Sequence, residues 1–490
     1  MAEKKTFLSN EEQEGDDIPP PAALDHHASG SKKLTLVPLI FLIFYEVSGG
    51  PIGTEASVKA GGPLLALLGF IFFPFIWSVP EALVTAEMST AFPENGGYVL
   101  WTSSAFGPFW GFLQGWWKWT SGVINTATYP ILCVDYLQSI LPVVAAGAAR
   151  VSGIFGFTLA LTYLNYRGLT VVGWSAVMLG VASLLPFFIM VGFSLPTLVP
   201  SRWLGLGGNG ESVDWREYLN VLFWNLNFWD NASTLAGEVE DPGRTFPRAI
   251  LMAGFLVAGC YLLPLLAGTG AVDVVRSEWE DGFFAILALR LGGKWLQWWM
   301  ELGATLSCFG LFAAQMSSSS FQVLGMADMG ILPAFLSIRS SYGTPTIGIL
   351  LSCSGALLLS FMSFTDIIQA ANALYSFGML LEFAAFLWLK FKAPDMYRPF
   401  QVPMGLVGCM VMCFPPCALL IFVLLLSSLK VAMIACLVTI MGILLYICLH
   451  YTNERSWMKF VILTETYTTP PSEFQTNDGS KEEDALLFGA

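Results

Sequence analysis

The stretch Phe44-Tyr45-Glu46-Val47-Ser48-Gly49-Gly50-Pro51-Ile52-Gly53-Thr54-Glu55 interrupts the first long apolar segment of the sequence, Leu36–Ala60. Three glycines and one proline fall within the five positions from Gly49 to Gly53. Proline removes a backbone donor and clashes with the preceding turn, and glycine favours non-helical backbone. The stretch therefore predicts a membrane helix that is broken near its middle. A kinked but continuous helix is the alternative interpretation.

The composition indicates that this chain is solvated by a lipid bilayer. Of its 490 residues, 55% are hydrophobic and only 12% are charged, whereas soluble proteins carry roughly 25% charged residues. Apolar runs of membrane-spanning length follow one another along the chain, and they predict an all-α membrane protein with twelve transmembrane helices. The predicted spans are Leu36–Ala60, Gly62–Phe92, Phe106–Leu141, Ile154–Tyr166 with part of the preceding segment, Thr170–Leu195, Tyr218–Glu240, Pro247–Ala271, Lys294–Leu324, Thr346–Phe364, Ile367–Leu389, Met404–Ser427 and Val431–Tyr451.

An even number of spans places both termini on the same side of the membrane. Lysine and arginine are about twice as numerous in the segments on that side, so the positive-inside rule predicts that both termini are cytoplasmic. We expect a multi-pass protein of the cell membrane, with an endomembrane as the alternative. Residues 1–33 and 453–490 are expected to be cytoplasmic tails, the first of them disordered, on either side of a twelve-helix membrane domain at 34–452. The net charge of -13 argues against nucleic acid as a partner.

A second polar interruption lies in the sixth predicted span, Phe223-Trp224-Asn225-Leu226-Asn227-Phe228-Trp229-Asp230-Asn231-Ala232-Ser233. An ionisable residue in the middle of a span is energetically unfavourable in a bilayer, and it is therefore by default a candidate functional residue. The first and sixth spans are the first members of two successive sets of five helices. Interruptions at corresponding positions of two halves point to an inverted-repeat transporter whose substrate site lies at the breaks.

Two longer motifs carry a resemblance to a known family. They are Glu87-Met88-Ser89-Thr90-Ala91-Phe92-Pro93-Glu94-Asn95-Gly96-Gly97-Tyr98 and Gly237-Glu238-Val239-Glu240-Asp241-Pro242-Gly243-Arg244-Thr245-Phe246-Pro247-Arg248-Ala249-Ile250. With the glycine-rich first span, they make the chain resemble the amino acid–polyamine–organocation superfamily over roughly Leu34–Tyr451. More narrowly, it resembles the plant polyamine uptake transporters, which are also described as L-type-amino-acid-like.

The resemblance implies a leucine-transporter-type (LeuT) fold, in which two inverted sets of five helices, with helices 1 and 6 broken, are followed by helices 11 and 12. It also implies proton-coupled import of putrescine, spermidine or spermine, with dicationic bipyridinium herbicides of the paraquat type as further candidate substrates. Some bacterial members place a lysine in the fifth span, but Thr170–Leu195 has none. Because of this difference, the resemblance does not identify the residue that carries the coupling proton, and the carboxylates within the spans are the candidates.

The charges inside the spans fit a polycationic substrate. A polyamine needs carboxylates at intervals and aromatic faces, each of which adds about 0.5–2 kcal/mol of cation–π attraction. Lys118 is the clearest basic residue inside a span, so the buried charge is mainly negative. The acidic residues in the spans are Glu46, Glu81, Glu87, Asp230, Glu238, Glu301 and Glu382.

Glu46 and Asp230 are the best candidates for binding the substrate ammonium groups, because they flank or lie within the two breaks. Internal structural pairs, or protonated and hydrogen-bonded acids, are the alternatives for both. The remaining candidate substrate-binding residues are Ser48, Gly49 and Gly50 at the first break, Trp224, Asn227 and Trp229 at the second, and Trp119, Glu301, Gln315, Tyr375 and Glu382 elsewhere.

The candidates outside the two breaks are each chosen for a different reason. Trp119 is interpreted as a cavity wall in preference to an interfacial belt. Gln315 falls, by its spacing from the motif Gly330-Ile331-Leu332-Pro333, where some bacterial relatives carry a gating tryptophan. Tyr375 and Glu382 are seven positions apart and so share one helical face. Glu301 and Glu382 are candidates for a distal amine of a long substrate, and a structural role is the equal alternative for each.

Charged residues beyond the sixth span are expected to form a cytoplasmic gating or structural network. These residues are Glu238, Asp241, Arg244 and Arg248, and Glu87 and Glu94 are interpreted in the same way.

The sequence argues against an enzyme, because it contains no metal-ligand cluster, no phosphate-binding loop and no nucleophile–base pair. We expect no metal and no cofactor. The expected partners are a polyamine, a coupling proton and the lipid bilayer, in a monomer or homodimer. A transporter of neutral or cationic amino acids on the same fold is the first alternative function, and a membrane nutrient sensor that binds without transporting is the second.

Overall fold

The computed structural model describes residues 33–138, 141–205, 212–273, 275–280, 282–360, 364–425 and 427–461. Within these ranges the chain forms helices joined by short connections, and its β pairing is limited to isolated bridges. The prediction of an all-α protein is confirmed. The predictions for the two tails fall mostly on residues 1–32 and 462–490, which lie outside the described residues.

Every predicted span coincides with one helix or with a pair of consecutive helices. Among the described residues, seven helical segments are individually long and apolar enough to cross a membrane, and shorter apolar helices accompany them. The helices of the spans are α1 Leu36–Val47, α2 Glu55–Ile76, α3 Ser78–Ala91, α5 Pro108–Leu137, α6 Gly147–Tyr166, α7 Leu169–Ser194, α8 Trp215–Leu226, η4 Trp229–Glu238, α9 Pro242–Ala271, α11 Lys294–Asp328, α12 Thr346–Leu359, α13 Phe364–Lys392, α14 Leu406–Leu425 and α15 Leu429–Glu454. Between spans lie α4 Tyr98–Phe106 and α10 Phe283–Gly292.

The boundary between the first and second spans lies at Gly62, inside α2. Its φ of 80° and ψ of 170° are non-helical, and a residue with a Cβ rarely adopts such a positive φ. Pro63 follows and begins the next helical stretch without needing a backbone donor. The first seven residues of α2 therefore belong to the first span, and the rest of α2 continues into α3 as the second.

The two broken spans lie side by side and run in opposite directions. At one end, the Leu34 N–H donates to Glu238 O at 2.8 Å. Towards the middle, Asn231 Nδ2 donates to Glu46 Oε2 at 3.0 Å. At the far end, the Asp214 N–H donates to Ala60 O at 3.0 Å. This antiparallel pairing is the arrangement expected of the first members of two inverted halves.

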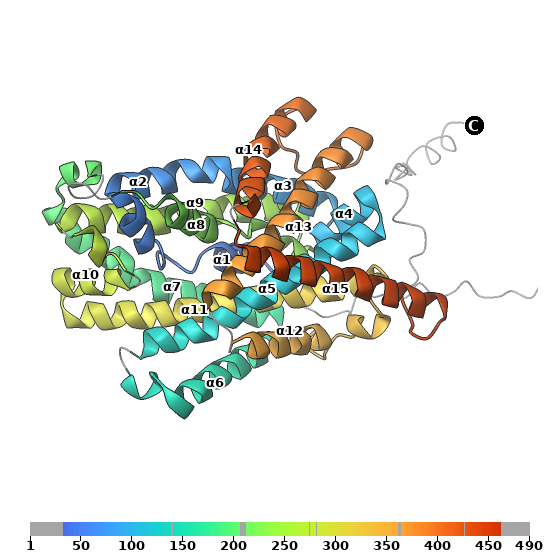
Figure 1. Ribbon diagram of the computed structural model, residues 1–490, viewed down its shortest axis with the longest axis horizontal. Helices are drawn as coiled ribbons and strands as arrows, with labels where there is room; N and C mark the ends of the chain where they lie inside the picture. Colours follow the sequence, from blue (N-terminus) through green and yellow to red (C-terminus); the bar gives the residue numbers. More distant parts are fainter. Residues whose placement is uncertain are drawn as a thin grey trace, which may run out of the picture. The chain divides into compact units, whose positions relative to one another are not determined.

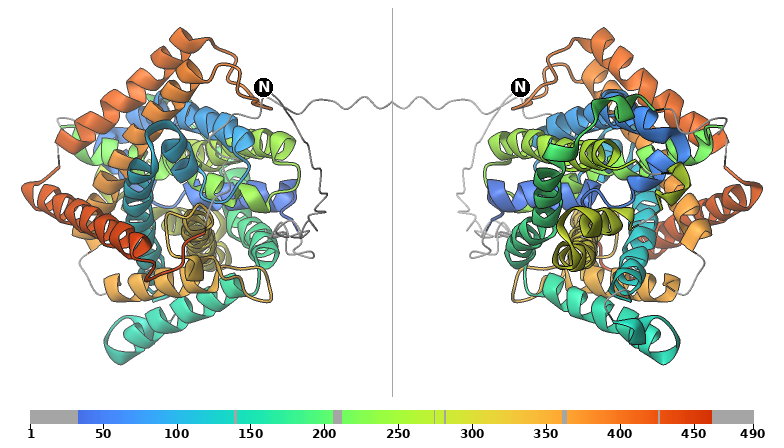
Figure 2. Two further views of the ribbon diagram at one scale, coloured as in Figure 1. Left: turned by 90° about the vertical axis from the view of Figure 1, so that its right-hand side faces the viewer. Right: turned by 90° about the vertical axis from the view of Figure 1, so that its left-hand side faces the viewer.

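The helices that surround this pair form the rest of the bundle. α11 packs against α5 and α7, and α13 packs against α5. Figures 1 and 2 show α14 at one edge of the bundle and α6 at the opposite edge. The outer faces of these helices expose large apolar side chains such as Val407, Phe414, Leu159 and Tyr163. An apolar exterior of this kind suits contact with lipid tails.

Both described ends of the chain lie at one end of the bundle, which we call the terminal end. Leu34 pairs with Val239 there, and Pro333 pairs with Phe460. Residues just after α15 thus pack on the bundle, with the Ala334 N–H donating to Lys459 O at 2.8 Å. The opposite end carries α10, at the left in Figure 1.

Candidate functional site

The first break separates α1 from α2 over residues 48–54. Gly50 has a φ of 106° and Gly53 a φ of 85°, values that glycine adopts at little cost. The Gly50 N–H donates to Ser48 Oγ at 3.1 Å, and the Gly53 N–H donates to Glu55 Oε2 at 2.8 Å. The predicted break is confirmed, and the alternative of a continuous kinked helix is wrong. Gly49 faces Leu311 of α11 so closely that a Cβ would collide with that side chain.

The second break lies between the end of α8 at Leu226 and the start of η4 at Trp229. Phe228 adopts a left-handed conformation with a φ of 71°, which is strained for a bulky side chain. The side chain of Asn227 is fully buried, and neither its Oδ1 nor its Nδ2 has a hydrogen-bond partner among the described residues. Buried amides are normally satisfied, so Asn227 points to a polar ligand or water at the break.

The last carbonyls of α8 are already bound by side chains. Tyr261 Oη donates to Asn225 O at 2.7 Å. Leu226 O accepts from Ser78 Oγ at 2.9 Å and from Trp229 Nε1 at 3.1 Å. A helix leaves its last carbonyls without intrahelical partners, and here the protein itself satisfies two of them. Leu226 O thus has two donors, and Asn225 O has a side-chain donor from α9.

Lys118 of α5 forms a buried ion pair with Asp230 of η4. The side chains are 1% and 0% exposed. The ammonium of Lys118 lies 3.8 Å from the ring centroid of Tyr375 and 5.1 Å from that of Tyr98, and it contacts Met379 Sδ at 3.0 Å. One carboxylate and two aromatic faces thus surround a single ammonium. This environment is the one that ammonium recognition requires.

The hydroxyl of Tyr375 ties the second break to Glu81 of α3. It lies 2.6 Å from Glu81 Oε1 and 3.2 Å from Asp230 Oδ1, and it accepts the Phe228 N–H at 3.0 Å. The Asp230 N–H also donates to Glu81 Oε1, at 3.3 Å. The strained backbone at Phe228 is therefore held by a side chain from α13, and Glu81 and Asp230 meet at one hydroxyl group.

Three carboxyl groups of this cluster retain oxygens without hydrogen-bond partners within the described residues. They are Glu46 Oε1, Glu81 Oε2 and both oxygens of Glu382. All three side chains are buried, at 2%, 0% and 0% exposure. Glu382 lies one helical turn beyond Gly378 and Met379, the part of α13 that packs against Lys118. Buried carboxylates need partners, and within the described residues these three acids and Asp230 have one ion pair, that of Asp230 with Lys118.

The structure does not bring every predicted residue to this cluster. Trp119 turns to α12, where its Nε1 donates to Ser352 Oγ at 3.2 Å. Trp229 caps Leu226, as described above, and faces Gly254 of α9. Glu301 is partly exposed and accepts from Gln297 on its own helix at 3.2 Å.

Trp224 and Gln315 occupy intermediate positions. The ring of Trp224 covers the first break, since a Cβ at Gly53 would lie 3.1 Å from its Cζ3. Gln315 is buried against Gly122 of α5 and its Oε1 has no partner in the described part of the chain. Trp224 thus covers the first break, and Gln315 leaves one buried acceptor beside α5.

Sequence reasoning missed the central position of Glu81, Lys118 and Tyr98. The available signal was an acidic residue or a lysine in the middle of a span. This signal identified Glu81 and Lys118, but it did not assign either residue to the substrate site. Tyr98 carries no such signal, because its position at the start of α4 lies between spans. Its Oη donates to Gln322 Oε1 at 2.8 Å, which holds the ring beside Lys118.

The terminal end is closed by a network that centres on Glu238. Glu238 Oε1 accepts from Asn95 Nδ2 at 2.8 Å and from Arg339 at 2.7 Å. Lys33 Nζ donates to Gly237 O at 2.6 Å. The prediction that Glu238 joins a network was correct. The described side-chain contacts of Glu238 come from distant segments, and of the other residues expected in this network Asp241 pairs with Arg244 at 3.8 Å.

A second network at this end centres on the buried Glu87 of α3. Its carboxylate pairs with Lys390 at 2.8 Å and with Arg398 at 3.2 Å, and it accepts the Val402 N–H at 2.8 Å. This carboxylate therefore joins α3 to α13 and to the loop before α14. Glu87 thus belongs to a charged network at the terminal end, and its gating or structural role stays a prediction.

Two glycines let the loop Asn95–Gly97 pass between η4 and α11 at the terminal end. A Cβ at Gly97 would collide with Ser233 of η4, and a Cβ at Gly325 of α11 would collide with the backbone of Asn95 and Gly96. Gly97 also has a φ of 42°. The loop is thus in backbone contact with both elements.

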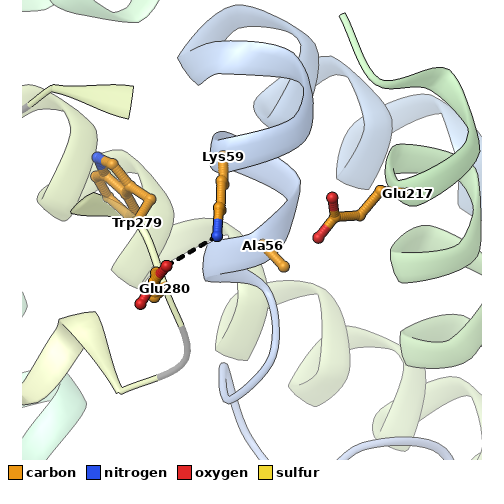
Figure 3. A pocket seen from close by; sticks show the side chains of 5 residues that line it. All are labelled: Ala56, Lys59, Glu217, Trp279 and Glu280. Atoms are coloured by element: carbon orange, nitrogen blue, oxygen red, sulfur yellow. Dashed lines mark hydrogen bonds and ion pairs between the residues drawn. The ribbon is translucent and has the colours of Figure 1, made fainter. Parts of the chain in front are cut away.

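A cavity of about 260 Å³ opens at the opposite end, beside the part of the first span that follows the break (Figure 3). It is lined by Ala56, Lys59, Glu217, Trp279 and Glu280. Lys59 Nζ pairs with Glu280 Oε1 at 2.9 Å, and Glu217 lies on the other side of Ala56. This polar cavity lies beyond the first break, as seen from the terminal end.

Comparison with known proteins places the chain in a family. The amino acid permease family matches residues 34–445, which covers all of the predicted spans except the end of the last. The chain belongs to the amino acid permease family. The resemblance found in the sequence is therefore confirmed, and the permease is a multi-pass membrane transporter rather than an enzyme.

Two relatives are similar over nearly their whole length. The permease is 56% identical to "Polyamine transporter PUT1" of Oryza sativa subsp. japonica over 434 residues, which cover 89% of this chain and 81% of that protein. It is 54% identical to "Polyamine transporter RMV1" of Arabidopsis thaliana over 429 residues, which cover 88% of each chain. Both relatives carry the name of one substrate class.

Proposed function

We propose that the permease is a secondary active transporter that imports polyamines such as putrescine, spermidine and spermine. The observation that carries this proposal is the charge of the buried cluster. Among the described residues, Lys118 pairs with Asp230, and the buried carboxyl groups of Glu46, Glu81 and Glu382 have oxygens without hydrogen-bond partners. A substrate with two or more ammonium groups supplies the missing cations. The names of the two relatives agree with this substrate class.

The substrate lies between the two breaks in this proposal. Glu46 and Asp230 bind its ammonium groups, with Glu81 added to the residues predicted from the sequence. Asn227 provides a polar contact, and the rings of Tyr375 and Tyr98 provide aromatic faces. Ser48, Gly49 and Gly50 form the wall at the first break, and Glu382 binds a distal amine of the longer polyamines.

The first break also bears on the alternative of an amino-acid substrate. In that case backbone N–H groups at the start of a half-helix would hold the substrate carboxylate. Two such groups, those of Gly50 and Gly53, are bonded internally to Ser48 Oγ and Glu55 Oε2. A carboxylate would have to displace these bonds and enter a cluster rich in negative charge. Both conditions favour a polyamine over an amino acid.

Transport proceeds by alternating access in this proposal, with protons as the coupling ion. The terminal end is cytoplasmic, and the Glu238 network closes it while substrate enters past the cavity beside Lys59. Movement of the broken spans then opens the network and closes the entrance. One of the buried carboxyl groups carries the proton. The permease works in the cell membrane, or alternatively in an endomembrane, as a monomer or homodimer.

Uptake of labelled spermidine into proteoliposomes tests the proposal directly. A panel of amines and amino acids is added as competitors at two external pH values. We expect putrescine and spermine to compete better than arginine or leucine, and uptake to rise at the lower pH. Preferential competition by amino acids would overturn the substrate class. Binding of spermidine without uptake would indicate a sensor instead of a transporter.

A further inference from the structure

The pairing of Lys118 has the chemistry of a binding site rather than that of a simple salt bridge. Its ammonium contacts Asp230, the ring of Tyr375 at 3.8 Å, the ring of Tyr98 at 5.1 Å and Met379 Sδ at 3.0 Å. Each of these groups recognises an ammonium without depending on its attachment to the protein. The same set of contacts would bind the terminal ammonium of a polyamine.

The carbon chain of Lys118 also has the form of the proposed substrate. Four methylene groups and one ammonium make up a lysine side chain, and the same aminobutyl unit is half or more of putrescine and spermidine. The stem lies across Gly378 of α13, where a Cβ would come within 2.8 Å of Lys118 Cε and 2.9 Å of its Cγ. The absence of a side chain at Gly378 thus leaves the space that the four-carbon stem of Lys118 occupies.

We propose that Lys118 occupies an ammonium subsite of the substrate-free permease and is displaced when a substrate ammonium binds at Asp230. This inference rests on the proposed function, because it requires an amine as substrate. Lys118 is then a tethered competitor of the substrate, and it keeps Asp230 paired while the site is empty.

The remaining carboxyl groups make the exchange feasible. When one ammonium replaces another, Asp230 is never left as an unpaired buried charge, which would be strongly unfavourable. The displaced ammonium of Lys118 stays in the same cluster, where Glu81 and Glu382 have oxygens without hydrogen-bond partners among the described residues. If Lys118 were a permanent counter-ion of Asp230, its ammonium would not need these additional carboxylate oxygens.

The variant Lys118→Met tests the inference, because methionine fills the space of the stem and has no ammonium. A competitor that occupies the subsite nine-tenths of the time raises the apparent Kd about tenfold. We therefore expect the Kd for putrescine, measured by calorimetry on the purified full-length permease in nanodiscs, to fall about tenfold in Lys118→Met. The matched control is Lys392→Met, which removes one exposed positive charge at the end of α13 and should leave the Kd unchanged.

A second variant keeps the inference testable if Lys118→Met does not fold. Lys118→Ala lacks three methylene groups and the ammonium, and n-propylammonium replaces these atoms. We expect n-propylammonium to bind this variant, to raise its melting temperature and to compete with putrescine for the vacated subsite.

The outcomes separate this inference from the proposed function. If the wild-type permease binds no polyamine, the proposed function fails. If it binds putrescine but the Kd of Lys118→Met falls by less than threefold or rises, the inference alone fails. In Lys118→Ala, a putrescine Kd that n-propylammonium leaves unchanged or lowers would show that Lys118 is a fixed counter-ion, and it would equally overturn the inference.

Discussion

Replacement of Asp230 by asparagine should both destabilise the permease and abolish transport. The side chains of Asp230 and Lys118 are 0% and 1% exposed, so Asp230→Asn leaves an ammonium buried without its counter-ion. Removal of one partner of such a pair costs about 3–5 kcal/mol. We expect a value near the lower limit, about 3 kcal/mol, because Lys118 can turn to unpartnered oxygens of Glu81 or Glu382.

A double-mutant cycle measures the interaction energy between Asp230 and Lys118. The double variant Asp230→Asn with Lys118→Met contains no unpaired charge at this position. It should therefore be more stable than Asp230→Asn alone, with a coupling energy of about 2–3 kcal/mol between the two sites. Spermidine uptake should remain absent in the double variant, because Asp230 is needed to bind an ammonium. Stability is thus restored without activity.

Thermal unfolding of the purified proteins in detergent, together with proteoliposome uptake, measures both effects. Asp241→Asn is the control, since the side chain of Asp241 is 59% exposed and lies 3.8 Å from Arg244. An exposed pair of this kind contributes about 0–1 kcal/mol, so this variant should behave like the wild type. If the two single substitutions have additive effects, or if Asp230→Asn unfolds at the wild-type temperature, the ion pair is not the stabilising contact described here.

Three further substitutions test other parts of the molecule. Glu382→Gln should lower the affinity for spermine about tenfold more than that for putrescine, since a charged hydrogen bond contributes about 1.5–3 kcal/mol; equal losses in uptake competition would argue against a distal-amine role. Glu238→Gln should loosen the terminal end, so the Leu34 amide, which donates to Glu238 O, should exchange with deuterium faster than amides of α13; uniform exchange rates would contradict this. Tyr375→Phe keeps the ring over Lys118 but leaves the Phe228 N–H without its acceptor, at a cost of about 1–3 kcal/mol; an unchanged melting temperature would refute the role of the hydroxyl.

The breaks in the two spans could be predicted from sequence because their cause is local. Glycine and proline determine the backbone at the first break wherever the helix packs. At the second, an aspartate among asparagines signals a polar environment at mid-span. These signals placed Glu46, Asn227 and Asp230 correctly at the breaks. Glycine permits the positive φ that Gly50 and Gly53 adopt.

The pairing of Lys118 with Asp230 could not be predicted in the same way. The two residues are 112 positions apart, and their contact depends on how α5 is rotated about its axis. Successive residues of a helix point about 100° apart. Lys118 and its neighbour Trp119 therefore face different helices, and the sequence provides no means of choosing between them. The structure turns Lys118 to the cluster and Trp119 to α12.

The partners of Glu238 show a related limit. The sequence offered Asp241, Arg244 and Arg248 because they are nearby along the chain. The structure instead brings Asn95 and Arg339 from either side. Tertiary contacts of a membrane bundle join segments far apart in sequence, and local spacing does not reveal them.

The passage of the Asn95–Gly97 loop between η4 and α11 has a consequence for the proposed opening of the terminal end. A Cβ at Gly97 would collide with the side chain and backbone of Ser233 in η4, and a Cβ at Gly325 would collide with the backbone of the loop. These contacts leave little space for the loop to slide along either element, so in the proposed cycle we expect the elements to separate, or to move together with the loop, when the terminal end opens. A methyl group at either glycine would push the segments apart, and we expect it to weaken the closure of this end.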